Sequence, residues 1–273
     1  MEKAIIAFLI IGLTIAGILA YPVFNKGRRN RLKSRPLPAL WNAIVENNLP
    51  IYNRLSPTER RRLQGHIQVF LVEKQFIGCG GLQITEEIKI TIAAVACLLL
   101  LNEKGNYFAK LRSVLVYPNA YVVNETTSIG NYIVEEKRSA RLGESWTDQL
   151  VLSWEQVKQD TQNWQDGHNV ILHEFAHQLD REDGQVQGVP ILTQNSDYEI
   201  WAKVMTAEYQ QLCKDVERGA KTVMDSYGAT NPAEFFAVAT ETFFEKPQQL
   251  LTNHAKLYHQ LQQYYQLNPM QWL

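Results

Sequence analysis

Cysteine is scarce in this chain, and the three cysteines that are present form no pattern. Cys79, Cys97 and Cys213 are odd in number and lie at unrelated spacings. They make neither a disulfide framework nor a paired-cysteine metal clip. This usage suits a reducing compartment, where disulfides are rare.

An excess of charge of either sign is also missing. Lys and Arg number 27 and Asp and Glu number 28, so the formal net charge is −1. No strong positive field is present to recruit nucleic acid, and we expect no nucleic-acid partner. The glycine-rich stretch at 78–81 is not followed by Lys and then Ser or Thr, which argues against a phosphate-binding loop.

One apolar run reaches the length of a membrane span. Residues 4–24 carry no charge, and about twenty such residues cross the hydrocarbon core of a bilayer as a helix. Six basic residues follow the run, whereas only Lys3 precedes it, offset by Glu2. The positive-inside rule then predicts an outward N-terminus and a cytoplasmic body. The six basic residues are Lys26, Arg28, Arg29, Arg31, Lys33 and Arg35.

A cleaved export signal ending near Ala20 is the alternative to a membrane anchor. The region before the apolar run has little positive charge, the run is long for a signal, and Ile18 is a poor residue three positions before such a cleavage site. We therefore expect a single-pass anchor at 1–24 followed by a basic linker at 25–37. The linker either contacts anionic lipid headgroups or serves only as a topology signal.

Residues 173–177 read His-Glu-Phe-Ala-His, which is the H-E-x-x-H pattern of zinc hydrolases. On a helix, residues four apart lie on the same face, so His173 and His177 can bind one metal ion. Glu174 follows the first histidine, where its carboxylate can reach a metal-bound water. The alternative is that both histidines are ordinary, partly buried residues.

The surrounding residues favour a buried helix. Apolar side chains recur at helical spacing from Val170 to Leu179, and Asp166-Gly167 is a plausible helix start. A buried helix that carries two histidines and a glutamate needs partners for these polar groups. A metal ion would satisfy them together.

The third ligand is open from spacing alone. In a metzincin the pattern would continue with a glycine at position 180 and a third histidine at position 183. Here these positions hold Asp180 and Asp183, so that class is excluded in its usual form. Both aspartates remain possible oxygen ligands. Glu234 lies at the start of a second predicted helix, three residues after Asn231. It could be a metal ligand or a capping-box carboxylate that bonds back to the Asn231 N–H. Glu241 lies seven residues further on the same face.

Two separated segments resemble a known family. His-Glu-Phe-Ala-His-Gln-Leu-Asp at 173–180 and Tyr-Gly-Ala-Thr-Asn-Pro-Ala-Glu-Phe-Phe-Ala at 227–237 are similar to the Mlc titration factor A (MtfA) family of zinc-dependent peptidases. The second segment also resembles the catalytic domain of anthrax lethal factor. The resemblance runs from about residue 37 to the end of the chain.

This resemblance implies a gluzincin site, with a zincin-like fold around it. His173, His177 and Glu234 would bind one zinc ion per chain, Glu174 would act as the base, and Tyr227 would donate its hydroxyl near the reacting carbonyl. Tyr227 could equally be a packed loop aromatic. Glu241 either contacts a metal ligand from behind or lies on a solvated helix face, and we carry no family role onto it. The apolar run at the N-terminus departs from the soluble form of the family.

The pattern of the remaining chain predicts an α+β fold. We expect a helical N-terminal portion at 38–105 and a catalytic domain at 106–273. The strand before the metal-site helix could present its edge to an extended peptide or could lie in the core. Helices are predicted at 38–48, 57–72, 86–102, 195–218, 231–246 and 248–264, and strands at 112–117, 120–124, 131–136 and 148–154.

We therefore expect a zinc-dependent peptidase that acts on a peptide or protein substrate, anchored in a membrane with its active site in the cytoplasm. The alternative is a binding protein with a structural or vestigial metal site whose helices dock a transcriptional regulator, a partnership that the family name suggests. An intact Glu174 argues for the enzyme, since a structural site has no use for that carboxylate.

Overall fold

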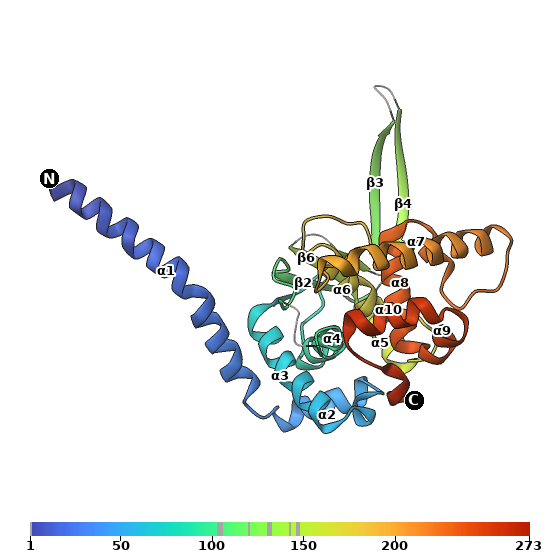
Figure 1. The fold of residues 1–273 in the computed structure, drawn as a ribbon, viewed down its shortest axis with the longest axis horizontal. Coiled ribbons are helices and arrows are strands. Elements are labelled where there is room, and N and C mark those ends of the chain that lie inside the picture. Colours follow the sequence, from blue (N-terminus) through green and yellow to red (C-terminus); the bar gives the residue numbers. More distant parts are fainter. Residues whose placement is uncertain (1, 103–105, 120, 130–132, 142, 146–147) are drawn as a thin grey trace.

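The computed structural model describes residues 2–273, apart from 103–105, 120, 130–132, 142 and 146–147. Within these residues helices predominate, and they surround a small, mainly parallel sheet (Figure 1). The helices are α1 Glu2–Lys33, α2 Ala39–Asn48, α3 Pro57–Glu73, α4 Glu86–Leu98, α5 Trp154–Gln162, α6 Val170–Asp180, α7 Asn195–Glu217, α8 Pro232–Glu245, α9 Pro247–Asn253 and α10 Ala255–Tyr265. The strands are β1 Gln75–Gly78, β2 Ser113–Tyr117, β3 Tyr121–Ile129, β4 Ile133–Arg141, β5 Gly143–Ser145 and β6 Gln149–Ser153. The expected mixture of helix and strand is confirmed.

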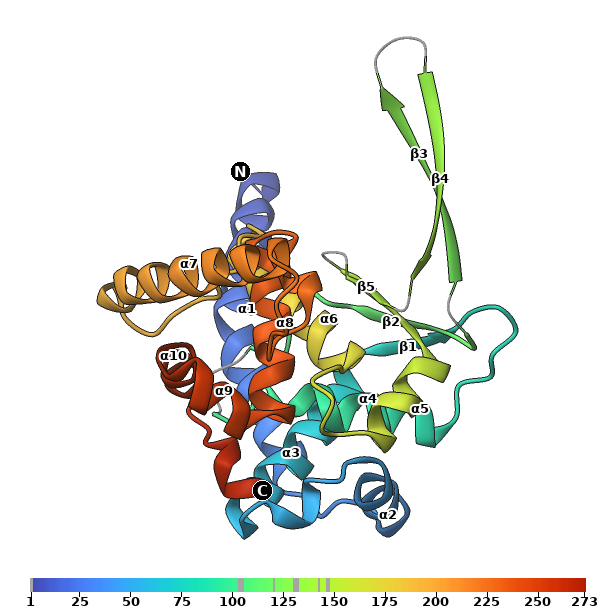
Figure 2. The same ribbon diagram turned by 90° about the vertical axis from the view of Figure 1, so that its right-hand side faces the viewer.

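The four-stranded sheet has the order β1-β2-β6-β5. Strands β1, β2 and β6 are parallel, and β5 pairs with β6 in the antiparallel sense. β6 therefore lies inside the sheet, so of the two expectations for this strand, the core strand is correct and the peptide-facing edge is wrong. Among the described residues, the outermost strand of the sheet beside α6 is β5. Strands β3 and β4 form a separate hairpin that stands away from the body (Figure 2).

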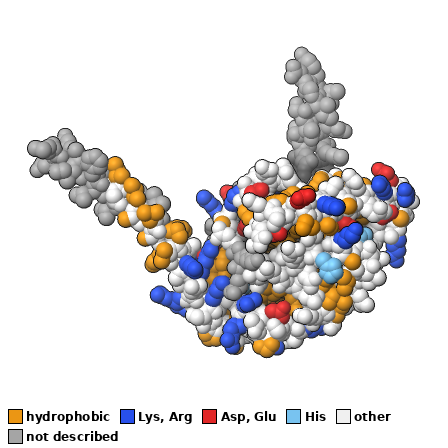
Figure 3. All heavy atoms as spheres, viewed as in Figure 1, with side chains coloured by type: hydrophobic (Ala, Val, Ile, Leu, Met, Phe, Trp, Pro, Cys, Tyr) orange, Lys and Arg blue, Asp and Glu red, His pale blue; other side chains and the backbone are white. Residues whose placement is uncertain are grey.

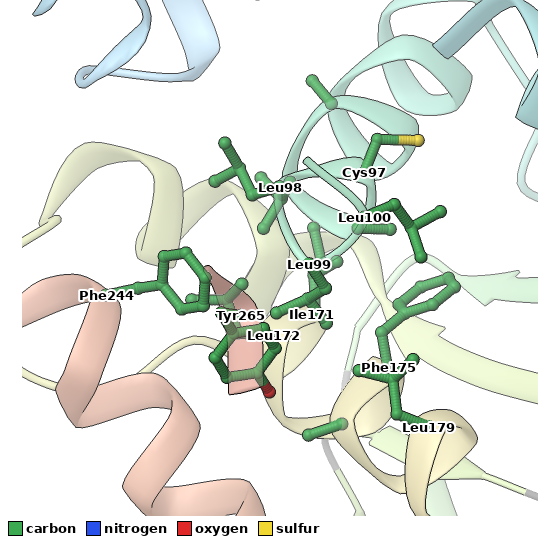
Figure 4. Packing of buried hydrophobic residues seen from close by; sticks show 14 of the residues in the cluster. Cys97, Leu98, Leu99, Leu100, Ile171, Leu172, Phe175, Leu179, Phe244 and Tyr265 are labelled. Atoms are coloured by element: carbon green, nitrogen blue, oxygen red, sulfur yellow. The ribbon is translucent and has the colours of Figure 1, made fainter. Parts of the chain in front are cut away.

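Helix α6 lies at the centre of the body, between the sheet on one side and α8 on the other (Figure 2). Its apolar residues join the core beside the end of α4, where Phe175 lies against Leu100 (Figure 4). The Phe175 ring is fully buried and packs edge-on against Phe108, with 4.8 Å between the ring centroids. A buried phenylalanine contributes about 3–5 kcal/mol relative to alanine, so this packing fixes the helix that carries both histidines.

Helix α1 runs out from the body as one continuous helix (Figure 1). The apolar side chains on its outer part are exposed, with Leu19, Val23 and Phe24 each more than 70% accessible. Among the described residues, this is the one helix that is long and apolar enough to cross a membrane, by length and composition. The last two turns of α1 belong to the expected basic linker, yet they are helical and pack on α3, where Arg29 pairs with Glu73.

Several element boundaries differ from the sequence prediction for local reasons. The predicted strand 148–154 ends at Ser153 because the Ser153 side chain caps α5, a helix that the sequence analysis missed. The predicted helix 248–264 is divided at His254, whose non-helical backbone ends α9 and begins α10. The metal-site helix is capped by Asn169 and not by Asp166, which accepts a hydrogen bond from the His168 N–H.

Other predicted segments meet residues outside the described ranges. Residue 120 of the strand 120–124 and residues 131 and 132 of the strand 131–136 fall there, while the remaining residues of both lie in β3 and β4. The expected domain boundary after residue 105 falls at the undescribed stretch 103–105. Strands β1 and β5, which are four and three residues long, were not predicted.

Candidate metal centre

Two histidines of α6 face the same side of the helix, as their spacing predicts. Asn169 caps the helix through Oδ1, which accepts the N–H of Leu172 at 3.1 Å. The rings of His173 and His177 lie with their centroids 4.8 Å apart and nearly perpendicular to each other. Their Nε2 atoms are 3.2 Å apart, so both nitrogens point toward one place.

Glu234 of α8 lies opposite these two nitrogens. Asn231 caps α8, accepting the N–H groups of Ala233 and Glu234 at 3.0 Å each, while Pro232 occupies the first helical position. The Glu234 Oε2 atom lies 3.0 Å from His173 Nε2 and 3.2 Å from His177 Nε2. The carboxylate is thus turned toward the histidines and away from the capping arrangement that the sequence left open.

The triangle formed by these three atoms has the dimensions of a tetrahedral metal site. Zinc binds histidine nitrogen and carboxylate oxygen at about 2.0–2.1 Å, which places two ligands of a tetrahedron about 3.3 Å apart. The three observed separations of 3.0, 3.2 and 3.2 Å are close to that value. Among the described residues, these three form the one group of His, Cys, Asp or Glu side chains arranged to hold a metal. The residues present therefore fit a zinc ion.

The two aspartates that remained open as ligands lie elsewhere. The Asp180 carboxylate accepts the backbone N–H groups of Gly188 and Val189 at 2.9 and 2.7 Å. Asp183 accepts the N–H of Gln185 at 2.8 Å. Both side chains therefore organise the chain after α6, and neither belongs to the His and Glu cluster.

Glu241 is the residue to which sequence reasoning gave no role. It is 2% exposed, and its Oε1 atom lies 2.7 Å from His173 Nδ1. Its Oε2 atom accepts the N–H of Asn169 at 2.6 Å. One carboxylate thus orients the first histidine through the nitrogen that faces away from Glu234. The sequence showed only a second carboxylate seven residues after Glu234, on a helix that carries other polar residues as well, and this pattern did not identify the contact with His173.

The charges in the site shift the pKa values of its members in different directions. Burial raises the pKa of Glu174 above its ordinary value. Burial also disfavours the charged forms of His173 and Glu234. For both residues, attraction between the histidines and the carboxylates outweighs this effect of burial. Glu241 and Glu234 hold the pKa of His173 well above its ordinary value, and both histidines lower the pKa of Glu234.

Tyr227 lies beside the cluster, in a short 3₁₀ helix at Ser226–Ala229. Its ring centroid is 5.9 Å from that of His173, and its side chain is 53% exposed. The Asp225 carboxylate accepts the Tyr227 N–H at 2.7 Å and thereby shapes this turn. The tyrosine is therefore a neighbour of the first histidine and not a core aromatic.

A cavity of about 580 Å³ opens on the cluster. Its walls include His177 and Glu234, the side chain of Arg181 at the end of α6, and the start of α8. A cavity of this volume falls within the usual range for sites that bind small molecules or short peptide segments.

The family can be identified by comparison with known proteins. Residues 24–266 match the family described as glucose-regulated metallo-peptidase M90. The chain belongs to this family. The match spans nearly the whole body, including both helices that carry the cluster, so the M90 assignment covers the candidate site.

Relatives named Mlc titration factor A confirm the resemblance found in the sequence. The protein from Klebsiella pneumoniae is 30% identical over 227 residues, which cover 82% of this chain and 84% of the relative. The protein from Pectobacterium atrosepticum is 31% identical over 235 residues, covering 84% and 86%. An uncharacterized protein from Synechocystis is 49% identical over 272 residues, covering 99% and 98%, so that similarity extends through the region of α1.

Proposed function

We propose that this M90 family member is a zinc-dependent peptidase that hydrolyses peptide bonds. The observation that carries the proposal is the near-equilateral triangle formed by His173 Nε2, His177 Nε2 and Glu234 Oε2, with Glu174 adjacent on α6. These three residues would hold a zinc ion and would leave it accessible to water or substrate, as a catalytic site requires.

Each ligand is held by the fold. His173 and His177 are set by the capped helix α6, Glu234 by the capped start of α8, and Glu241 orients His173 through Nδ1. When bound here, zinc would supply Lewis-acid polarisation of a carbonyl and a water of lowered pKa. This arrangement of two histidines and a downstream glutamate is the gluzincin type.

The catalytic roles fall to Glu174 and Tyr227. Glu174 takes a proton from the attacking water and passes it to the leaving amine nitrogen. Its raised pKa supports this role, because a carboxyl that can hold a proton part of the time can also deliver it. Tyr227 donates its hydroxyl to the oxygen of the reacting carbonyl, where negative charge develops.

The substrate is a peptide or a protein segment in an extended conformation. Within the described part of the sheet, β5 is the outermost strand beside α6, and an extended peptide can pair with the backbone of such a strand. The cavity of about 580 Å³ beside His177 then receives a side chain of the substrate.

The apolar part of α1 anchors the protein in a membrane, with the active site in the cytoplasm. The exposed apolar side chains of α1 support the anchor, and the six basic residues that follow residue 24 support the orientation.

Replacement of Glu174 tests the enzymatic proposal directly. In the full-length protein, Glu174→Gln should keep one zinc per chain and lose peptidase activity by orders of magnitude, because it removes a proton acceptor and leaves the ligands. Zinc is measured by elemental analysis and activity on a peptide library. Glu217→Gln, which removes an exposed carboxylate at the end of α7, should change neither. Full activity in Glu174→Gln would rule out the peptidase mechanism.

A second candidate is a binding protein that docks a transcriptional regulator, with a structural or vestigial metal site. The name Mlc titration factor A of the relatives favours it. The Glu174→Gln variant also distinguishes the two candidate functions. A protein whose regulator binding survives Glu174→Gln, and whose wild type cleaves no peptide in the library, would support the binding protein.

A further inference from the structure

A second cavity lies where α1 joins the body, apart from the candidate metal centre. Its volume is about 850 Å³. Its walls are the stretch of α1 that begins at Tyr21, the end of α3 and the segment 106–112. None of its lining residues belongs to the candidate metal centre, so a separate role is needed to explain it.

The lining of this cavity is strongly basic. Six cationic side chains and one carboxylate, Glu73, surround it, which leaves an excess of five positive charges. Figure 3 shows Lys and Arg side chains gathered where α1 meets the body. Burial lowers the pKa of Lys74 to about 8, which leaves this side chain largely protonated at neutral pH. The six cationic residues are Lys26, Arg28, Arg29, Lys33, Lys74 and Arg112.

Some of these cations build the walls. Arg29 makes two hydrogen bonds of 2.8 Å with the Glu73 carboxylate, and its guanidinium lies 4.6 Å from the centroid of the Tyr107 ring. Lys74 donates to the carbonyl oxygens of Phe108 and Leu111 at 2.7 and 2.8 Å. These contacts hold the cavity open in a fixed shape without a ligand.

Other cations are available to a ligand. Lys26 and Arg112 are both exposed, and neither makes an ion pair or side-chain hydrogen bond within the described part of the chain. They come from α1 and from the residue before β2, so they line the cavity from different elements. An anion in the cavity could contact both.

The position of the cavity along α1 indicates the source of that anion. The exposed apolar residues of α1 end at Phe24, and the cavity begins at Tyr21, so the two overlap by one turn. Tyrosine is enriched at the level of lipid headgroups. A molecule with an anionic end and an apolar tail could place the first in the cavity and the second along α1.

We propose that this cavity binds the phosphate headgroup of an anionic phospholipid whose acyl chains lie against α1. The proposal rests on the membrane anchor proposed above and is independent of the peptidase chemistry. A bound headgroup would hold the body of the protein against the cytoplasmic leaflet in one orientation.

The test measures lipid binding to the full-length protein in nanodiscs of phosphatidylcholine. Phosphatidylglycerol is titrated in, and bound lipid is counted by native mass spectrometry. The double variant Lys26→Gln with Arg112→Gln should bind phosphatidylglycerol about twenty-five-fold more weakly, at about fivefold for each basic residue lost. Both side chains are exposed, so zinc content and the midpoint of thermal unfolding should be unchanged.

The matched control removes one lysine and one arginine elsewhere. Arg61→Gln with Lys256→Gln changes exposed residues outside the cavity and should leave lipid binding as in the wild type. Equal loss in both double variants would show a general charge effect and overturn the proposal. Equal binding of phosphatidylcholine, or displacement of the lipid by millimolar inorganic phosphate, would also overturn it, the latter in favour of a site for free phosphate. Failure of the anchor itself is detected separately, because the protein would then leave membranes on alkaline extraction.

Discussion

Glu241 connects the metal-site histidine to the start of the helix that carries it. One of its oxygens lies 2.7 Å from His173 Nδ1 and the other accepts the Asn169 N–H. A carboxylate in this position keeps a proton on Nδ1, so that Nε2 is the nitrogen directed to the place where a metal would bind. The orientation of the histidine is thus fixed before any ion binds.

Replacing this carboxylate with an amide should weaken zinc binding. We expect Glu241→Gln to lower zinc affinity by about 10- to 100-fold, the range seen when such supporting groups are changed. Competition with a chromophoric chelator measures the affinity. Glu199→Gln removes an exposed carboxylate of α7 and should bind zinc as the wild type does. An unchanged affinity in Glu241→Gln would show that the hydrogen bond does not support the site.

Zinc binding should also release a proton. Burial disfavours the charged form of His173, but Glu241 and Glu234 outweigh this and raise its pKa well above the ordinary value. In protein stripped of metal, this shift favours the protonated form of His173, so we expect a metal to displace a proton from Nε2. We expect release of about one proton, so that the apparent affinity falls about tenfold for each pH unit below 7. Calorimetry in buffers of different ionisation enthalpy counts the protons, and a heat independent of the buffer would contradict this.

At the scale of elements, α6 depends on its cap. The Asn169 side chain accepts the Leu172 N–H and donates to the buried carboxylate of Glu245 at 3.1 Å. Asn169→Ala removes the cap, which should lower the free energy of unfolding by about 1 kcal/mol. It also removes one hydrogen-bond donor to Glu245, which should lower it by a further amount of about 1–3 kcal/mol. We therefore expect the free energy of unfolding to fall by about 2–4 kcal/mol in chemical denaturation, together with weaker zinc binding.

A second cap in the same molecule provides the control for this change. Ser56 and Glu59 form a capping box at the start of α3, outside the metal centre. Ser56→Ala should cost about 1 kcal/mol and leave zinc affinity unchanged. If both variants weakened zinc binding equally, the effect would reflect general destabilisation and not the position of α6.

The elements that the sequence predicts well are those with local signals. The capping box at Ser56, the proline after Asn231 and the helical spacing of the apolar residues each act within a few residues, and α3, α6 and α8 follow them closely. Strands β1 and β5 carry too few residues to show an alternating pattern. The start of α5 depends on whether Ser153 continues a strand or caps a helix, which the pairing of β6 decides.

The same distinction holds for the candidate site. The histidines lie four residues apart, so a helix alone brings them together. Glu234 is separated from His177 by 57 residues, and Glu241 from His173 by 68, so their positions depend on how α8 packs on α6. The resemblance to a known family supplied Glu234, while nothing local distinguished Glu241 from a solvated residue.

At the scale of the whole molecule, α1 has an exposed apolar part, which we propose as the membrane anchor, and a basic part that packs on α3. We expect the full chain to fractionate with membranes and to resist high salt, because about twenty apolar residues hold it there. Deleting residues 1–24 should give a soluble protein that keeps its zinc and activity. Deleting residues 1–36 should lower the free energy of unfolding by about 2 kcal/mol relative to the 1–24 deletion, because it also removes the charged hydrogen bonds between Arg29 and Glu73.

The expected orientation is checked in the same cells. A protease added to intact cells should leave the body uncut, and the same protease added to opened cells should digest it. Digestion in intact cells, or a mature N-terminus just after Ala20, would show that residues 4–24 are an export signal. Retention in the membrane after deletion of residues 1–24 would place the anchor elsewhere.

The separation of the ligands along the chain has a thermodynamic consequence. Glu234 and His177 enclose a loop of 57 residues that contains the whole of α7. In an unfolded chain, closing a loop of that length through a metal would cost about 4 kcal/mol of configurational entropy, or roughly a thousandfold in affinity. The folded chain has already closed the loop through the packing of α6 on α8, so zinc would bind the folded state and stabilise it. It would then act as a removable cross-link, and α7 should gain more amide-exchange protection from it than α4, which lies outside the loop.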